Sequence, residues 1–313
     1  LLLGRLNISK IISDTNKVTI DNVKDIFYEK LSKNLFLDEI KTAEAVIKIA
    51  NTKMAGAIRM VSISLGVDPR DFTLFAFGGA GPLHASSLAK ELGIPKVLIP
   101  ARPGITNALG CVVADLRQDF TKTLNIPLDK LYIKNLHSIF DEQEKRGVEL
   151  IKKQGLELTS ISSSFSVDMQ FIGQTHILRI NLPNSNPDLE YLQKSFEKFY
   201  LNRFKVRLPE IKANIVNVNT TVQGHKIPFD ISLLNNKLDK RLVLDDALIE
   251  HRKVYFKDKF INTPIYSRDR MPFEFEIKGP AIIEQMDTTT LIEPEDRAFG
   301  DNLGNMFIEV GGL

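Results

Sequence analysis

The sequence has little cysteine, no tryptophan and no marked excess of charge of either sign. A single cysteine, Cys111, among 313 residues excludes an internal disulfide and a metal site built from several thiolates, and it suits a reducing cytoplasm. No apolar run reaches the ~18 residues that a membrane-spanning helix needs, and the N-terminus lacks the pattern of a signal peptide. The 41 basic and 39 acidic side chains give a net charge of +2, which does not favour nucleic acid as a partner. We therefore expect a cytoplasmic protein with neither a membrane nor a nucleic-acid partner, and a small anionic ligand remains open.

The composition is that of a globular protein. Hydrophobic residues make up 43% and charged residues 26%, and 18 glycines with 14 prolines are ordinary numbers, which excludes a disordered or collagen-like chain. The length suits about two domains of ~150 residues. The chain begins Leu1-Leu2-Leu3-Gly4 without methionine. This apolar start indicates a cut inside a domain.

The first third of the chain has an α/β pattern. Helical spacing of apolar residues over 36–66 is followed by an apolar strand at 72–77, a glycine-rich turn, a helix over 83–92 and a second strand at 96–100. The segment 105–116 predicts a helix whose small residues pack closely against a neighbour. Cys111 lies in this segment, where a buried, inert thiol is expected.

The rest of the chain changes character twice. A helix with a charged face is expected within 126–158, strands within 161–182, a helix over 187–205 and a strand over 215–223. From about 226 onward, short strands and turns replace helices. We expect three domains: an α/β part at 1–125, an α+β domain at 126–225 and a β-rich module at 226–313.

The turn Gly78-Gly79-Ala80-Gly81 is the leading candidate site. It follows an apolar strand and begins a helix, so its backbone can approach a ligand closely and its free N–H groups can hold an anion. Tight packing of strand on helix would explain the same glycines. No Lys-Ser or Lys-Thr follows, which excludes a Walker loop, and the dinucleotide fingerprint fails because His84 stands where its third glycine belongs. His84 could donate to a ligand or cap the helix.

Other polar residues interrupt apolar patterns further along the chain. Asp168, Gln174 and His176 are candidates for a ligand or subunit contact, and Glu284 and Asp287, beside three threonines, could bind a cation or an anionic substrate. A polar hairpin without a ligand would show the same residue pattern around Glu284 and Asp287. The remaining histidines, at 137, 225 and 251, are expected on the surface, and no metal-ligand spacing occurs. No Gly-x-Ser-x-Gly elbow is present, so covalent catalysis is not expected.

Several unusual strings occur in order over nearly the whole chain, and together they resemble the hydantoinase A/5-oxoprolinase family, which includes the ATP-binding subunits of acetone and acetophenone carboxylases. Gln170 departs from the arginine usual in the family. The matching strings lie at 2–6, 51–59, 68–72, 75–85, 103–104, 108–110, 114–117, 168–174, 279–284, 287–290 and 304–305.

The resemblance implies an actin/Hsp70-like ATPase fold (ribonuclease H-like) in which Gly78, Gly79, Ala80 and Gly81, with His84, line the nucleotide site. It also implies that ATP with Mg²⁺ activates a carbonyl oxygen by phosphorylation, so that a cyclic amide is opened by hydrolysis. Catalysis would rest on positioning and charge stabilisation. The catalytic acid or base stays unknown.

Family proteins carry an N-terminal half with the loops that hold Mg²⁺ and the phosphates, and no counterpart of it occurs in this sequence. We therefore expect a C-terminal portion whose partners are that N-terminal half, a hydantoinase B-type subunit and a small-molecule substrate, with homo-oligomer formation left open. Two alternatives remain: the ATP-binding subunit of a ketone carboxylase, and a non-catalytic scaffold that docks the B-type partner.

Overall fold

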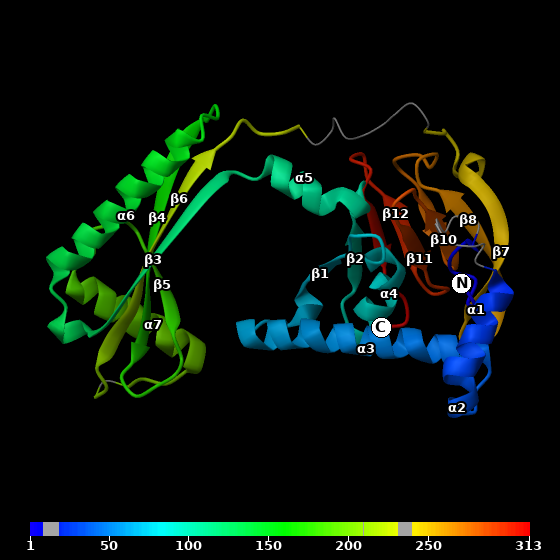
Figure 1. Cartoon of the computed structure of the whole chain (residues 1–313), viewed down its shortest axis with the longest axis horizontal. Helices are drawn as coiled ribbons and strands as arrows, with labels where there is room; N and C mark the ends of the chain where they lie inside the picture. The colour runs from blue at the N-terminus through cyan, green and yellow to red at the C-terminus, as the bar shows by residue number, and fades with distance from the viewer. Residues whose placement is uncertain (9–18, 209, 231–239) are drawn as a thin grey trace. The chain divides into compact units, whose positions relative to one another are not determined.

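The computed structural model describes residues 1–8, 19–208, 210–230 and 240–313. They form two compact units: unit 1 comprises Leu1–Gly110 and Asp230–Leu313, and unit 2 comprises Cys111–Phe229. Each unit is a mixture of helices and sheets (Figure 1). No helix in the described ranges is long and apolar enough to cross a membrane.

Helix α3, Glu39–Leu65, is the longest element of unit 1. Asp38 caps its start by accepting a hydrogen bond from Lys41 N at 2.7 Å, and Gly66 ends it with a φ of +68°, a backbone conformation that glycine adopts without strain. The other helical elements of this unit are α1 (Ile20–Phe27), a π-helix (Tyr28–Ser32), α2 (Lys33–Leu35), α4 (Gly81–Leu92), α5 (Thr106–Val113, which runs into unit 2), and short 3₁₀ turns at Pro69–Asp71, Pro103–Ile105 and Leu244–Ala247.

Two sheets complete unit 1. One has the order β1-β2-β13-β12-β9 and the other has the order β11-β10-β8-β7. Alanine, leucine and isoleucine side chains of α4, β2, β10 and β13 share one core cluster, so α4 is held between the sheets. The strands are β1 (Thr73–Phe75), β2 (Lys96–Ile99), β7 (Leu248–Phe256), β8 (Lys259–Ser267), β9 (Glu276–Lys278), β10 (Ala281–Glu284), β11 (Thr289–Ile292), β12 (Arg297–Gly300) and β13 (Met306–Glu309).

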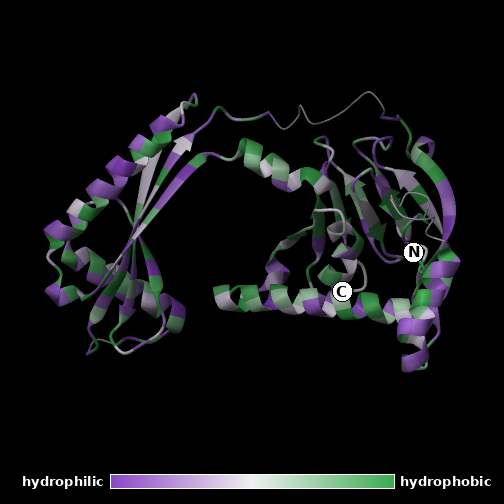
Figure 2. Ribbon diagram, viewed as in Figure 1, coloured by the Kyte–Doolittle hydropathy of each residue, from purple (hydrophilic) through white to green (hydrophobic). Residues whose placement is uncertain are grey.

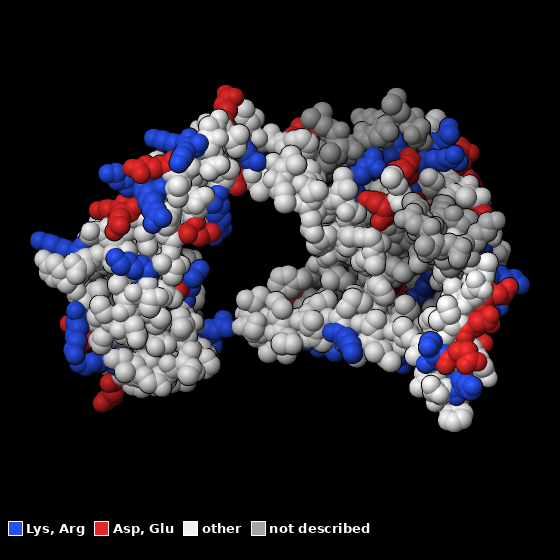
Figure 3. All heavy atoms as spheres, viewed as in Figure 1, with Lys and Arg blue, Asp and Glu red and all other residues white. Residues whose placement is uncertain are grey.

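Unit 2 is a four-stranded antiparallel sheet with two helices. Its strands lie in the order β3-β6-β4-β5, and α6 and α7 share one core with the apolar side chains of the sheet. Along α6, acidic and basic side chains alternate on the surface, as its sequence predicts (Figure 3). The elements are β3 (Leu116–Pro127), a 3₁₀ turn (Leu128–Lys130), α6 (Ile133–Lys153), β4 (Ser160–Phe171), β5 (Leu178–Leu182), α7 (Leu189–Phe204) and β6 (Ala213–His225).

The expectation for the small-residue helix is wrong in one respect. Figure 2 shows α5 as a largely hydrophobic helix, yet none of its residues is buried and Cys111 is exposed. A Cβ added to Gly110 would meet nothing within 4 Å, so this glycine does not serve a close helix crossing in the described chain. The long strand β3 was not expected at all, because its alternation begins directly where the helical pattern ends.

The C-terminal strands are divided between two sheets: β7, β8, β10 and β11 pair with one another, whereas β9, β12 and β13 belong to the sheet that contains β1 and β2. Strand β13 pairs with β2, from the first third of the chain, so that residues 230–313 join residues 1–110 in one compact unit. The three consecutive domains expected from the sequence remain a prediction about independent folding. Pairing between strands that are far apart in the sequence depends on the tertiary structure, and no local sequence pattern predicts it.

Candidate functional site

The glycine turn lies between the end of β1 and the start of α4. Gly78 has a φ of +80°, and its N–H donates to Pro103 O at 2.8 Å, which ties the turn to the loop after β2. Pro82 occupies the first turn of α4, where its missing N–H leaves no helical hydrogen bond unmade. The turn is therefore fixed by its hydrogen bond to the loop after β2, and α4 begins directly after it.

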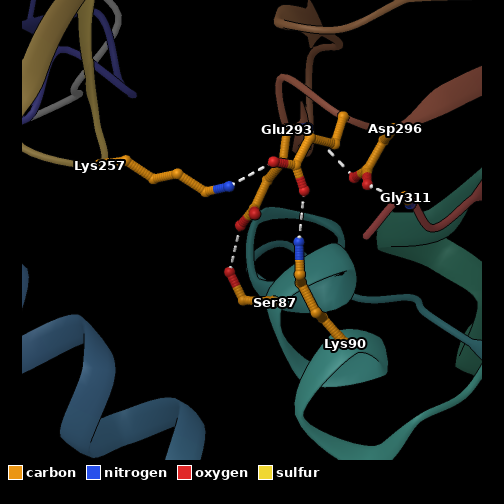
Figure 4. A network of polar contacts seen from close by, with 7 residues as sticks. Ser87, Lys90, Lys257, Glu293, Asp296 and Gly311 are labelled. Atoms are coloured by element: carbon orange, nitrogen blue, oxygen red, sulfur yellow. Dashed lines mark hydrogen bonds and ion pairs between the residues drawn. The ribbon is translucent and has the colours of Figure 1, made fainter. Parts of the chain in front are cut away.

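A polar network anchors α4 to the loop between β11 and β12 (Figure 4). Ser87 donates to Glu293 at 2.5 Å, and Glu295 accepts from Lys90 at 2.8 Å and from Lys257 at 2.6 Å. These two lysines lower the pKa of Glu295 to about 2. The network fixes the helix that begins at the glycine turn.

The loop after β10 packs against the glycine turn, although Thr288 of this loop is 209 residues from Gly79 in the sequence. Thr288 Oγ1 contacts both Gly79 O at 3.0 Å and Gly78 O at 3.2 Å. A Cβ on Gly79 would lie 3.3 Å from Asp287 O, and a Cβ on Gly104 would lie 2.1 Å from Asp287 Oδ2. The glycines at 79 and 104 thus let this loop approach closely, which adds a packing role to any ligand role.

One pocket of about 610 Å³ opens between these loops, within the size range of small-molecule sites. It brings Gly79, expected at the nucleotide, together with Glu284 and Asp287, expected at a substrate or subunit contact. Its lining residues are Leu6, Asn7, Gly79, Ile249, Ser267, Asp269, Glu284, Gln285, Met286, Asp287, Thr288 and Thr289.

Among the residues that the structure describes, the lining carries carboxylates and no lysine or arginine. Glu284 is paired with Arg252 at 3.0 Å, and Asp269 is paired with Arg102 at 3.3 Å. Asp287 Oδ1, by contrast, is buried and accepts no hydrogen bond within the described residues. A buried carboxylate oxygen without a donor is costly. The Asp269 side chain, by contrast, is 49% exposed and can accept hydroxyl or amino hydrogens from a ligand.

His84 lies outside this pocket. Its Nδ1 is 2.7 Å from Asn51 Oδ1 on α3, and burial together with nearby Arg5 lowers the pKa of the imidazole. A neutral His84 therefore joins α4 to α3 in this structure.

The other predicted residues lie in unit 2. Asp168 is buried and pairs with Arg179 across β4 and β5, at 2.9 Å, and it also accepts from Asn217 at 3.0 Å. Burial by itself would raise the pKa of Asp168, but these hydrogen bonds outweigh it, and the pKa lies below its ordinary value. The carboxylate thus joins three strands of the sheet.

Gln174 and His176 lie in the loop between β4 and β5. Tyr200 donates to Gln174 Oε1 at 2.7 Å, while His176 is exposed and its ring packs at a tilt against Phe204. The structure therefore does not bring these two residues together with Asp168 in one polar cluster.

Sequence reasoning placed Thr288 in a candidate cluster without singling it out, and it missed Gly104 as a part of the site. Thr288 stood inside a run of three threonines, and only the fold selects the one whose hydroxyl meets the turn. Gly104 follows a proline, and this pair of residues predicts a loop but does not predict which segment the loop contacts. Over the described residues, no group of three or more histidine, cysteine or acidic side chains could hold a metal ion.

Two family models match the chain. Residues 1–120 match hydantoinase/oxoprolinase, and residues 129–307 match the hydantoinase/oxoprolinase C-terminal domain. An uncharacterized protein of Methanocaldococcus jannaschii, MJ0964, is 33% identical over 309 residues, which are 99% of this chain and 43% of that protein. Caprolactamase subunit alpha of Pseudomonas jessenii is 28% identical over 94% of this chain and 43% of its own length.

The fold also has a solved counterpart. The crystal structure of ATP-dependent caprolactamase from Pseudomonas jessenii superposes with a TM-score of 0.81 at 27% identity, covering 99% of this chain and 46% of that one. This chain thus spans less than half the length of these relatives. The chain belongs to the hydantoinase/oxoprolinase family.

Proposed function

We propose that this chain is the C-terminal portion of an ATP-dependent enzyme that opens a cyclic amide. Family membership and the likeness to caprolactamase support this activity. Acetone carboxylase gives a lower TM-score of 0.69 at 23% identity, a likeness of fold alone, so ketone carboxylation is the alternative. ATP would supply the phosphoryl group that activates the amide carbonyl.

The observation that carries the proposal is the meeting of the glycine turn with the loop at Asp287. Gly79 and Asp287 line the same pocket, and Thr288 Oγ1 donates to Gly79 O at 3.0 Å beside them. Carboxylates of the lining, two of which are paired with arginine, would accept hydrogen bonds from ribose hydroxyls. We assign this pocket to the adenosine side of ATP in an actin/Hsp70-like arrangement.

The phosphates and Mg²⁺ would then be held by the N-terminal half that family members carry. A B-type partner subunit is part of the same proposal, since the caprolactamase relative is a subunit alpha. The scaffold alternative predicts instead that the turn is purely structural.

Exposed apolar side chains on unit 1 support the proposal that an N-terminal half of the enzyme packs against it. Met60, Ile63 and Leu65 of α3 are 70%, 75% and 61% exposed, and Phe75 of the edge strand β1 is 45% exposed. Apolar surface of this extent on one side of a domain marks an interface. We assign it to the N-terminal half of the enzyme. The substitution Ile63→Glu should leave the melting temperature unchanged and prevent co-purification of that half; unchanged co-purification would contradict the assignment.

Calorimetric titration of the chain with adenosine and with ATP–Mg²⁺ tests the pocket. We expect weak binding of both ligands, with dissociation constants within about threefold of each other, because phosphate contacts are absent. Gly79→Val should abolish binding. Gly56→Val, on α3 where an added Cβ meets nothing within 4 Å, is the matched control.

Equal binding by Gly79→Val and the parent chain would reject the nucleotide role and favour the scaffold alternative. In the complete enzyme, stimulation of ATP hydrolysis by a cyclic amide supports the proposed reaction. Stimulation only by a ketone with bicarbonate would favour the carboxylase.

A further inference from the structure

The sheet of unit 2 has one apolar and one polar face. Helices α6 and α7 cover the first, where α6 contacts Thr220 and Val222 of β6. Because side chains alternate along a strand, Thr221 and Gln223 point to the second face, and their partners on β4 are Ser164 and Ser162. The second face therefore carries hydroxyl and amide groups, beside the Arg117–Asp119 ion pair of β3.

Three side chains at one end of this face form a relay. Ser162 Oγ is 2.7 Å from His225 Nε2, and His225 Nδ1 is 2.7 Å from Asp115 Oδ2. Ser162 lies near the start of β4, His225 is the last residue of β6, and Asp115 directly precedes β3. All three belong to unit 2, whereas the pocket described above belongs to unit 1.

The hydrogen bonds fix the direction of the relay. Lys226 N donates to Asp115 Oδ1 at 3.0 Å, and this bond, followed by the contact with His225, lowers the pKa of Asp115. An ionised carboxylate only accepts, so the histidine proton lies on Nδ1 and Nε2 is left to accept from the serine hydroxyl. This is the tautomer that a general base requires.

The serine is accessible, and a donor stands beside it. Ser162 is exposed, and the His225 side chain is 34% exposed. Gln223 pairs directly with Ser162 across β4 and β6, and its side-chain amide makes no hydrogen bond within the described residues. Directly paired residues have Cβ atoms about 5 Å apart. When Ser162 Oγ is bonded to an acyl carbon, the amide of Gln223 can therefore reach the carbonyl oxygen of that acyl group.

We propose that Ser162, His225 and Gln223 form an acyl-transfer site for small activated esters, with Asp115 as a positioning residue. Ser162 Oγ bonds to the acyl carbon and its proton passes to His225 Nε2. Gln223 donates to the carbonyl oxygen as negative charge develops there. The ester C–O bond then breaks and the leaving alkoxide takes the proton from His225. Water, deprotonated by His225, releases the acid and restores Ser162.

The purified 313-residue chain is treated with a fluorophosphonate probe and, separately, with 4-nitrophenyl acetate. We expect one adduct, located on Ser162 by peptide mass spectrometry, and ester hydrolysis above the buffer rate. Ser162→Ala should remove the adduct, and His225→Gln should slow labelling about a hundredfold. Ser164→Ala, two residues along the same face, should label as the parent chain does.

Asp115→Asn keeps an acceptor for Lys226 N but no longer fixes the histidine tautomer, so labelling should slow at least ~10-fold while the melting temperature stays within a few degrees. Thermal melts of every variant separate loss of reaction from loss of fold. An adduct at another residue, no adduct at all, or a labelling rate unaffected by His225→Gln in a folded variant would each overturn the proposal.

Discussion

The contact between Gly104 and Asp287 allows a sharp test of the site's construction. A Cβ at residue 104 would lie 2.1 Å, 2.5 Å and 2.6 Å from Oδ2, Cγ and Cβ of Asp287. Ordinary contacts between such atoms are ~3.5 Å. Since the Cβ of Asp287 is itself too close, rotation of the side chain does not relieve the conflict in Gly104→Ala. The loop that carries Thr288 must move.

The cost has two parts. Forcing extra atoms into a packed region costs about 1–3 kcal/mol, and loss of the Thr288 hydrogen bond to the glycine turn costs about 1 kcal/mol. For a unit of ~150–250 residues, each kcal/mol lowers the melting temperature by roughly 2–4 °C. Differential scanning calorimetry of Gly104→Ala should therefore show a decrease of about 5–15 °C.

Two further variants make the result decisive. Gly56→Ala adds the same methyl group to the interior of α3 where nothing lies within 4 Å, and it should stabilise by about 0.5–1 kcal/mol through helix propensity. Asp287→Gly removes all three conflicting atoms, so the double variant with Gly104→Ala should regain most of the loss. Equal melting temperatures for Gly104→Ala and Gly56→Ala, or no recovery in the double variant, would refute the reasoning.

Four other predictions follow from single contacts. Thr288→Val should destabilise by about 1 kcal/mol in urea unfolding, because the turn loses its hydroxyl donor; an unchanged midpoint would contradict this. Arg179→Met should cost about 1–2 kcal/mol in the same assay, since Asp168 is buried, and its pKa, followed by NMR, should rise; an unmoved pKa would show that the pair does not act. Glu295 has a lowered folded pKa, so its contribution is present above its ordinary pKa of 4.5 and declines as the pH falls toward about 2. The difference in melting temperature between the parent chain and Glu295→Gln should shrink over that window, and a constant difference would exclude the ion pairs as its source. Cys111 is exposed, so it should react with Ellman's reagent in the folded chain; reaction only after denaturation would contradict the exposure.

The sequence by itself determined the local elements and the family. Helical spacing ending at Gly66, the apolar strand before Gly78 and the helix after Pro82 are short-range patterns, and the structure confirms each of them. The strings that resemble the family depend on residue identity alone, and the family models confirm that resemblance.

Tertiary structure alone decided which distant loops meet. The pairing of β13 with β2 and the contact of Thr288 with Gly79 join segments about 200 residues apart, and no periodicity encodes such a contact. Ser162 and His225 are 63 residues apart, and no local pattern predicts their contact either. Local patterns determine elements because their causes are local. Sites depend on the burial of shared apolar surface, which brings together residues whose spacing along the chain is unconstrained.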